Sequence, residues 1–306
     1  MNKHSSIAAA GSLIERATNL YDFTDALRGR AAPAMELPAD LPPPVTPAVV
    51  DPAASAPPSV PPVALPWRGP VQRIDREKLV EGGYILPDDQ ATALSEEFRI
   101  VKRDLIAQLA GNPRGNRVLV CSAHSGEGKT FCAINLALSL AAEKDRDVLL
   151  VDADFGKPGI PEALGLSSGP GLMDALTDPT VQIEDCVLRT DLPSLAILPA
   201  GQRSNADTEF LASARTAILL DRLTQGRPDR IVIFDSPPLL AASPAAVLAS
   251  HAAVALLVVR ADRTGESALR DAAGMLKGGV QVQLILNAVQ FSATGRRFGS
   301  YYSKGD

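Results

Sequence analysis

Residues 123–130, AHSGEGKT, combine glycines, a lysine and a threonine at the spacing of a phosphate-binding loop. Gly126 and Gly128 let the backbone approach phosphate oxygens closely, so that its N–H groups converge on them. Lys129 offers a positive charge to the β- and γ-phosphates, and Thr130 offers its hydroxyl to magnesium. The motif therefore predicts a site for the phosphates of a nucleotide together with Mg²⁺.

Three carboxylates follow apolar runs elsewhere in the chain. Asp152 and Asp154 end the run VLLVDAD, where an extended chain points both to the same side, and Asp235 ends the run IVIFD. Each alone could cap a helix or a turn. The carboxyl ends of parallel strands meet at one edge of a sheet, so all three are expected beside the phosphate loop. Together they favour a magnesium site formed by Thr130, Asp152 and Asp235.

Apolar runs of strand length alternate with segments long enough for helices, and the helix expected after the phosphate loop is KTFCAINLALSLAAE. Strands that are apolar on both faces are typical of a parallel sheet covered by helices on each side. The sequence therefore predicts an α/β fold with a doubly wound, mainly parallel sheet. Its expected strands are residues 117–123, 147–154, 195–201, 230–236, 254–261 and 282–289.

Composition limits the class of protein. The chain has 306 residues and a formal charge of −5, which argues against a nucleic-acid partner. The first thirty residues have no apolar stretch of signal-peptide length, so a cytoplasmic location is expected. Cys121, Cys132 and Cys186 lack metal-ligand spacing, and we expect buried thiols without a disulfide or zinc.

An uncharged stretch at residues 236–259 has the length of a membrane span. Prolines interrupt it and its end, VALLVV, is typical of a strand. We interpret it as a strand end, a loop, a short helix and a buried strand.

Composition also divides the chain. Residues from about 32 to 70 carry roughly half of its 25 prolines and almost no aromatics, which is typical of a disordered linker. The segment before it has helical apolar spacing. The expected organisation is a short amphipathic helix in 1–31, a linker in 32–75, a nucleotide-binding domain in 76–294 and a flexible tail in 295–306.

Several ordered motifs resemble the bacterial tyrosine kinases, the P-loop autokinases of capsule and exopolysaccharide export, and most closely their exosortase-associated exopolysaccharide-locus branch. The segments that carry the resemblance are SLIERA, SEEFRIVKRDLI, SGEGKTFCAINLA, VLLVDADFGKP, GPGLMDAL, LPAGQ and DRIVIFDSPPLL. The resemblance implies a MinD-like P-loop fold and a tyrosine autokinase that uses ATP and magnesium.

The same resemblance assigns roles to individual positions. It places Lys129 in the Walker A motif, Asp152 and Asp154 in the A′ motif and Asp235 in Walker B, as catalytic candidates, with Asp152 as the group that takes or holds the proton of the acceptor. It also implies that Asn287 contacts the adenine, although an asparagine at a strand end is also a common turn residue. The nucleotide-binding set is then Gly126, Glu127, Gly128, Lys129, Thr130, Phe131 and Asn287.

The chain departs from the family pattern at four positions. Ala123 replaces the first glycine of the loop, Ser125 a frequent proline, Gly156 an arginine and Pro244 an acidic residue. His124 stands where MinD and ParA-like ATPases carry an additional lysine, which favours the kinase interpretation. None of these changes removes a phosphate or magnesium ligand, but the losses at 156 and 244 are expected to weaken subunit pairing or turnover.

Two further features concern assembly. The tail carries Tyr301 and Tyr302, which resemble a short form of the tyrosine cluster that a neighbouring subunit phosphorylates in this family. Glu96, Arg99 and Lys102 are three residues apart and share one face of a predicted helix. They resemble the family's oligomerisation motif, with lysine in place of the last arginine, which lacks the bidentate fork.

The resemblance thus predicts a tyrosine autokinase that regulates exopolysaccharide or capsule polymerisation and export. The expected partners are a chain-length-determinant or co-polymerase membrane protein and further copies of the chain, arranged in a ring. This would place the protein in the cytoplasm, peripheral to the inner membrane. The alternative is a MinD/ParA-like nucleotide-switched ATPase that acts as a scaffold, and phosphotyrosine discriminates between the two.

Overall fold

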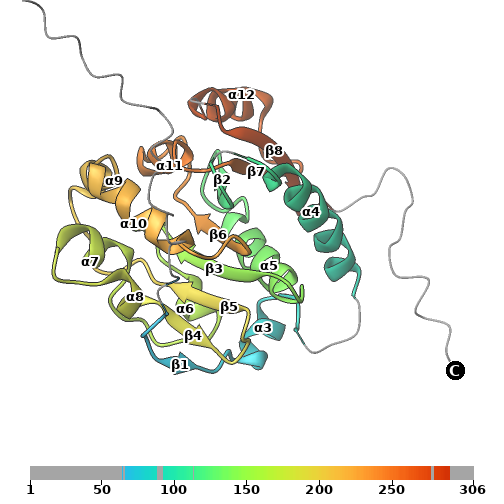
Figure 1. The fold of residues 1–306 in the computed structure, drawn as a ribbon. Helices are drawn as coiled ribbons and strands as arrows, with labels where there is room; N and C mark the ends of the chain where they lie inside the picture. The colour runs from blue at the N-terminus through green and yellow to red at the C-terminus, as the bar shows by residue number, and fades with distance from the viewer. Residues whose placement is uncertain (1–63, 65, 88–91, 113, 277–278, 290–306) are drawn as a thin grey trace, which may run out of the picture. The chain divides into compact units, whose positions relative to one another are not determined.

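The computed structural model describes residues 64, 66–87, 92–112, 114–276 and 279–289. They form an eight-stranded sheet in the order β1-β4-β5-β3-β6-β2-β7-β8, with helices on both of its faces (Figure 1). Neighbouring strands run parallel, except that β4 and β5 are antiparallel. The strands are β1 (Val71–Gln72), β2 (Arg117–Ser122), β3 (Asp147–Asp152), β4 (Leu188–Thr190), β5 (Leu195–Leu198), β6 (Arg230–Asp235), β7 (Val254–Arg260) and β8 (Gln281–Asn287).

The alternation of side chains along each strand explains the two helical layers. Leu119 and Phe234 face one buried cluster, whereas their neighbours Val118 and Ile233 face a second cluster on the other side of the sheet. Because every strand of the centre is apolar on both sides, each face needs a cover of helices. The predicted α/β, doubly wound and mainly parallel sheet is confirmed.

The helices divide between these two faces. Helices α3 (Arg76–Glu81), α4 (Ala93–Leu109), α5 (Lys129–Ala141) and α6 (Ile160–Ala163) contribute to one cluster. The other face is covered by α7 (Leu172–Thr177), α8 (Ile183–Cys186), α9 (Asp207–Leu211), α10 (Ala214–Thr224), α11 (Pro244–Ala249) and α12 (Glu266–Met275).

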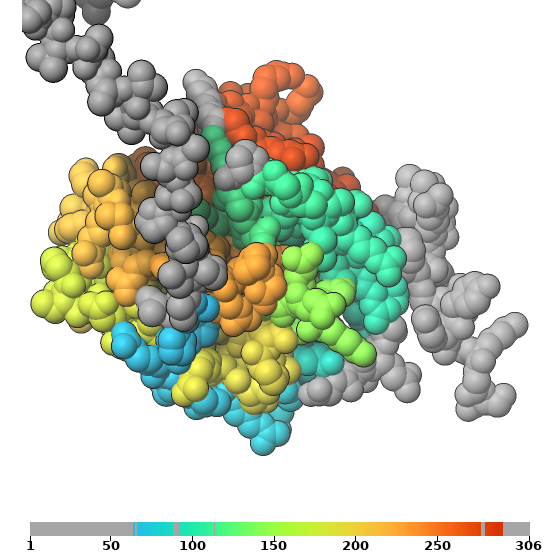
Figure 2. Space-filling model, in the orientation of Figure 1, coloured from blue at the N-terminus to red at the C-terminus, as the bar shows by residue number. Residues whose placement is uncertain are grey.

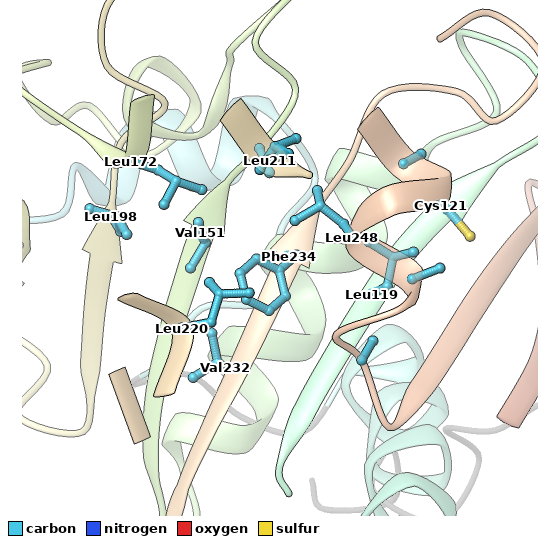
Figure 3. Packing of buried hydrophobic residues seen from close by; sticks show 14 of the residues in the cluster. Leu119, Cys121, Val151, Leu172, Leu198, Leu211, Leu220, Val232, Phe234 and Leu248 are labelled. Atoms are coloured by element: carbon cyan, nitrogen blue, oxygen red, sulfur yellow. The ribbon is translucent and has the colours of Figure 1, made fainter. Parts of the chain in front are cut away.

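Phe234 is the largest side chain of the central strands and lies in the cluster that α7 to α12 cover. Its ring lies between Leu220 of α10, Leu248 of α11 and Val151 of the neighbouring strand (Figure 3). All four residues are at most 1% exposed. The packing holds the carboxyl end of β6, and therefore the adjacent Asp235, in a fixed place.

The first described residues extend the sheet, which corrects the predicted domain boundary. Residues 71–72 lie in the range 32–75 that we expected to be linker, yet they form β1 and pair with β4. Gly69 packs so tightly that a Cβ there would lie 2.0 Å from the carbonyl oxygen of Val187. In Figure 2 this segment is the blue strip on the surface, and the yellow region beside it contains β4 and β5. The remaining predicted features of 1–31, of most of the linker and of 295–306 lie outside the described residues.

The uncharged stretch at 236–259 has the predicted structure. It comprises the loop after β6, the six-residue helix α11 and most of β7. Among the helices that the structure describes, none has the length and apolar character needed to cross a bilayer.

The three cysteines are buried free thiols, as predicted. Burial raises the pKa of Cys121 and Cys132 to about 12 and that of Cys186 to about 11. They are therefore unreactive thiols at neutral pH.

Candidate nucleotide and magnesium site

The phosphate-binding motif forms the turn between β2 and α5, as its sequence predicts. Gly126 and Gly128 adopt positive φ angles of 79° and 95°, and Gly128 is the N-cap residue of α5. A side chain at Gly128 is also excluded by space, since a Cβ would lie 2.0 Å from Nδ2 of Asn287. The first N–H groups of α5 therefore open onto the carboxyl edge of the sheet, where an anion binds favourably.

Glu127 is part of the loop, but its carboxylate is bonded to protein. It is 2% exposed, and its two oxygens accept hydrogen bonds from the backbone N–H of His124 at 2.9 Å and from the Thr264 hydroxyl at 2.5 Å. The expected contribution of Glu127 to nucleotide binding is thus restricted to its backbone. The sequence does not predict this role for Thr264, which follows β7 and belongs to no recognisable motif.

The three predicted carboxylates meet beside this loop. Asp152 and Asp235 are the last residues of β3 and β6 and lie directly opposite each other in the parallel ladder. Asp154 follows two residues later and holds Lys129 by an ion pair of 2.7 Å between its Oδ2 and Nζ. The β3–β6–β2 arrangement therefore brings the lysine and all three acids together.

Asp152 also has the capping role that we considered for each acid. Its Oδ2 accepts hydrogen bonds from the backbone N–H groups of Gly159 at 2.8 Å and Ile160 at 3.0 Å, at the start of α6. Its Oδ1 accepts a longer one from Asp154 at 3.3 Å. Burial raises the pKa of Asp152, and these three bonds oppose that shift.

Asp235 is the acid whose environment points most directly to a cation. It is 1% exposed, and its Oδ1 has no hydrogen-bond partner. Burial raises its pKa to about 7, against the opposing effects of the Lys129 charge and a hydrogen bond from the Thr130 hydroxyl. An unpaired buried carboxylate oxygen beside a hydroxyl fits a site for Mg²⁺, which binds few protein oxygens and keeps phosphate and water ligands.

The protein ligands alone do not make a complete metal cage. Within the described ranges, no group of three or more His, Cys, Asp and Glu side chains is placed to hold a metal ion. The donor set of Thr130 and Asp235 therefore fits a magnesium ion that arrives with a nucleotide, whose phosphates supply further oxygens.

Phe131 and Asn287, the other predicted nucleotide contacts, already have protein partners. The Phe131 ring stacks on Tyr84 with 5.4 Å between centroids. Asn287 donates from Nδ2 to the carbonyl oxygen of Glu127 at 2.9 Å. Both residues also line a groove of about 340 Å³ between α4 and the edge strand β8.

The predicted interface residues on α4 do not share one exposed face. Glu96 and Arg99 form an ion pair on the surface. Lys102 is only 6% exposed, because its ammonium reaches α5 and donates to the Ser139 carbonyl at 2.9 Å and to Glu143 at 2.5 Å. The prediction that Lys102 contacts another subunit is therefore corrected, because its ammonium is buried against Ser139 and Glu143 of the same chain.

Two departures from the family pattern now have a structural context. The guanidinium of Arg203, from the turn after β5, donates a hydrogen bond to the carbonyl of Gly156. Pro244 is the first residue of α11, where its missing N–H has no cost. The predicted acceptors Tyr301 and Tyr302 lie outside the described residues.

Comparisons with known proteins agree with this geometry. A family model described as an AAA domain matches residues 116–269. The kinase domain of VpsO is 32% identical, with a TM-score of 0.54, over 64% of this chain and 96% of that domain. The kinase domain of the Escherichia coli tyrosine kinase ETK is 26% identical, with a TM-score of 0.60, over 69% of this chain and 80% of that one.

Longer relatives match as well. The tyrosine-protein kinase wzc of Salmonella typhi is 31% identical over 191 residues, which are 62% of this chain and 26% of wzc. The chain thus spans less than a third of the length of this relative. The structure has a P-loop between β2 and α5 and acids at the ends of β3 and β6. Together with these matches, this shows that the chain belongs to the bacterial tyrosine kinase family of P-loop proteins.

Proposed function

We propose that this chain is an ATP- and magnesium-dependent protein tyrosine kinase that modifies tyrosines of further copies of itself. The observation that carries the proposal is the unpaired, buried Oδ1 of Asp235 beside the Thr130 hydroxyl and the phosphate loop. Magnesium, when bound there, would neutralise charge on the β- and γ-phosphates.

The residues of the site divide the work of phosphoryl transfer between them. Lys129 is bonded to Asp154 in the structure, and phosphates in the loop would compete for its ammonium. Its charge would then oppose the negative charge that develops during transfer. Asp154 would be released from the ion pair, next to Asp152, so that a carboxylate is free to receive the phenolic proton or to hold it through the metal.

The acceptors and partners follow from the family and from the sequence of the tail. We propose Tyr301 and Tyr302 as acceptors, presented to the site of a neighbouring subunit in a ring. The relatives wzc, EpsB and CapB, which are named tyrosine-protein kinases, support the kinase activity. From the family resemblance we propose a role beside polysaccharide export and a membrane partner of the chain-length-determinant class. The chain would then act in the cytoplasm, at the inner membrane.

The direct test is incubation of the purified chain with ATP and Mg²⁺, followed by measurement of phosphotyrosine. The proposal predicts phosphotyrosine that requires both cofactors. ATP hydrolysis without phosphotyrosine, in the presence of the partner's cytoplasmic peptide, would instead identify the nucleotide-switched scaffold that remains the alternative.

A further inference from the structure

Two side chains from outside the phosphate loop hold its carbonyl groups. The Gly126 carbonyl accepts a hydrogen bond of 2.8 Å from the guanidinium of Arg260, at the end of β7. The Glu127 carbonyl accepts one of 2.9 Å from Nδ2 of Asn287, at the end of β8. Consecutive peptide groups of the loop are therefore fixed by two neighbouring strands.

Peptide geometry determines what these bonds do to the loop's N–H groups. A trans peptide is planar, with its C=O and the following N–H on opposite sides, and the described residues contain no cis peptide. A Gly126 carbonyl held by Arg260 thus turns the N–H of Glu127 away from Arg260. In the same way, the bond from Asn287 turns the N–H of Gly128 away from β8.

In the part of the chain that the structure describes, neither the N–H of Glu127 nor that of Gly128 has a hydrogen-bond acceptor. Adjacent unpaired N–H groups before a helix form the concave donor set that binds phosphate. The outward carbonyl bonds therefore keep the donors pointed at the space where an anion would lie.

The amide of Asn287 is held by hydrogen bonds at both its nitrogen and its oxygen. Its Oδ1 accepts a hydrogen bond of 2.8 Å from the N–H of Ala288, while its Nδ2 faces the Glu127 carbonyl. The amide also packs directly on Gly128, where a Cβ would lie 2.0 Å from Nδ2. One N–H of Nδ2 and one lone pair of Oδ1 are thus engaged by the protein itself before any ligand binds.

Thr264 connects the Arg260 end of the system to the loop. Its Oγ1 accepts a hydrogen bond of 3.0 Å from the backbone N–H of Arg260 and donates one of 2.5 Å to the buried carboxylate of Glu127. The loop is thus tied to the end of β7 through a side chain as well as through its own carbonyl.

We propose that Asn287 and Arg260 are positioning residues that aim the N–H groups of Glu127 and Gly128 at the phosphates, and that Asn287 acts on the phosphate chain instead of the nucleobase. This inference rests on the proposed function, because it assumes that the loop binds a nucleotide. It replaces the expected adenine contact of Asn287 with a role in the loop itself.

A ligand without a base separates the two roles of Asn287. The affinities of wild type and of Asn287→Ala for ATP and for inorganic tripolyphosphate would be measured by calorimetry with Mg²⁺. Loss of one positioning hydrogen bond should lower the affinity for both ligands by the same factor, about 3- to 10-fold. A loss confined to ATP, or no loss for either ligand, would overturn the inference.

A second pair of variants keeps the test valid if Asn287→Ala does not fold. Thr264→Val keeps the shape of the side chain but removes the hydroxyl, so it should weaken tripolyphosphate binding, whereas Thr264→Ser should bind like wild type. Arg270→Ala, at an exposed ion pair on α12, controls for general surface changes. Equal tripolyphosphate binding by the two Thr264 variants would contradict the inference. If the wild-type protein still binds ATP in that case, the proposed function stands. A wild type that binds neither ligand would overturn both.

Discussion

At the scale of single residues, the environment of the Asp235 carboxylate favours the binding of a cation. Burial of its carboxylate raises its pKa to about 7, and one of its oxygens has no hydrogen-bond partner. Lys129 and Thr130 offset only part of this cost. A divalent cation next to the carboxylate would stabilise the charged form, so that metal binding and ionisation of Asp235 are linked.

The pH dependence of stability tests this environment. Between about pH 4 and pH 7, folded Asp235 holds a proton that the unfolded chain has released, so the stability of the metal-free protein must fall as the pH rises through this window. Asp235→Asn cannot ionise, and we expect it to reduce this loss by roughly 2–4 kcal/mol. Urea unfolding at pH 5 and pH 8 measures the difference. If the stability of the two proteins depended on pH in the same way, the raised pKa of Asp235 would be refuted.

Lys129 provides the second test at this scale. It is the loop side chain that can neutralise the β- and γ-phosphates, so Lys129→Met should lower the phosphorylation rate by at least about 100-fold. The fold should persist, because methionine keeps the length of the aliphatic chain. Circular dichroism checks the fold, and retention of wild-type phosphorylation would show that the site assignment is wrong.

Only some of the site could be predicted from residue types. Spacing within one segment identified Lys129 and Thr130, and strand-end acids identified Asp235. The support of the loop by Thr264 and Arg260 comes from residues more than a hundred positions away, without any motif of their own. Their part in the site exists only because β2 and β7 are neighbours in the sheet.

At the scale of elements, the contact between α4 and α5 depends on a buried ammonium. Lys102 of α4 donates to the Ser139 carbonyl and to Glu143, and its hydrogen bond lowers the pKa of Glu143. Breaking a bond to a charged group costs more than breaking a neutral one. Lys102 is therefore a helix-packing residue.

This role gives a prediction that separates packing from assembly. Lys102→Met should lower the free energy of unfolding by about 1–3 kcal/mol and leave self-association unchanged. Arg99→Ala, on the exposed part of the same helix, should weaken self-association with little effect on unfolding. Denaturant titration and light scattering measure the two effects. An oligomer lost in Lys102→Met at unchanged stability would contradict this division.

The elements that the sequence predicted are those with long apolar runs. All six predicted strands are present, because each is buried on both faces or pairs with a buried neighbour. β1 and β4 have two and three residues, too few for a period, and β1 pairs with a strand more than a hundred residues away. The short segment around Gly69 consequently could not be told from the proline-rich sequence that precedes it.

At the scale of the whole molecule, the proposal makes the tail a switch. Each phosphate adds about −1.5 to −2 charges, so that two would convert a tail with Arg296, Arg297 and Lys304 from net basic to net acidic. Such a tail would be repelled by the acids of a neighbouring site. Phosphorylation is thus expected to loosen an oligomer that the unmodified tail helps to hold together.

Removal of both hydroxyls tests the switch. Tyr301→Phe with Tyr302→Phe should preserve ATP binding, remove most of the phosphotyrosine and keep the oligomer assembled after incubation with ATP. Tyr84→Phe is the matched control, since the ring of Tyr84 stacks on Phe131 within the domain. Light scattering before and after incubation provides the measurement. Dissociation of the double variant on addition of ATP would refute the switch.

We propose that the acids and the lysine at the carboxyl edge of this sheet together catalyse phosphate transfer to tyrosine. Mass spectrometry of the purified chain after incubation with ATP and Mg²⁺, beside the Lys129→Met variant and a magnesium-free sample, tests it most directly. We expect phosphate on Tyr301 and Tyr302 in the complete wild-type reaction and in neither control. Unmodified tyrosines throughout the wild-type chain, despite measured ATP binding and an assembled oligomer, would contradict it.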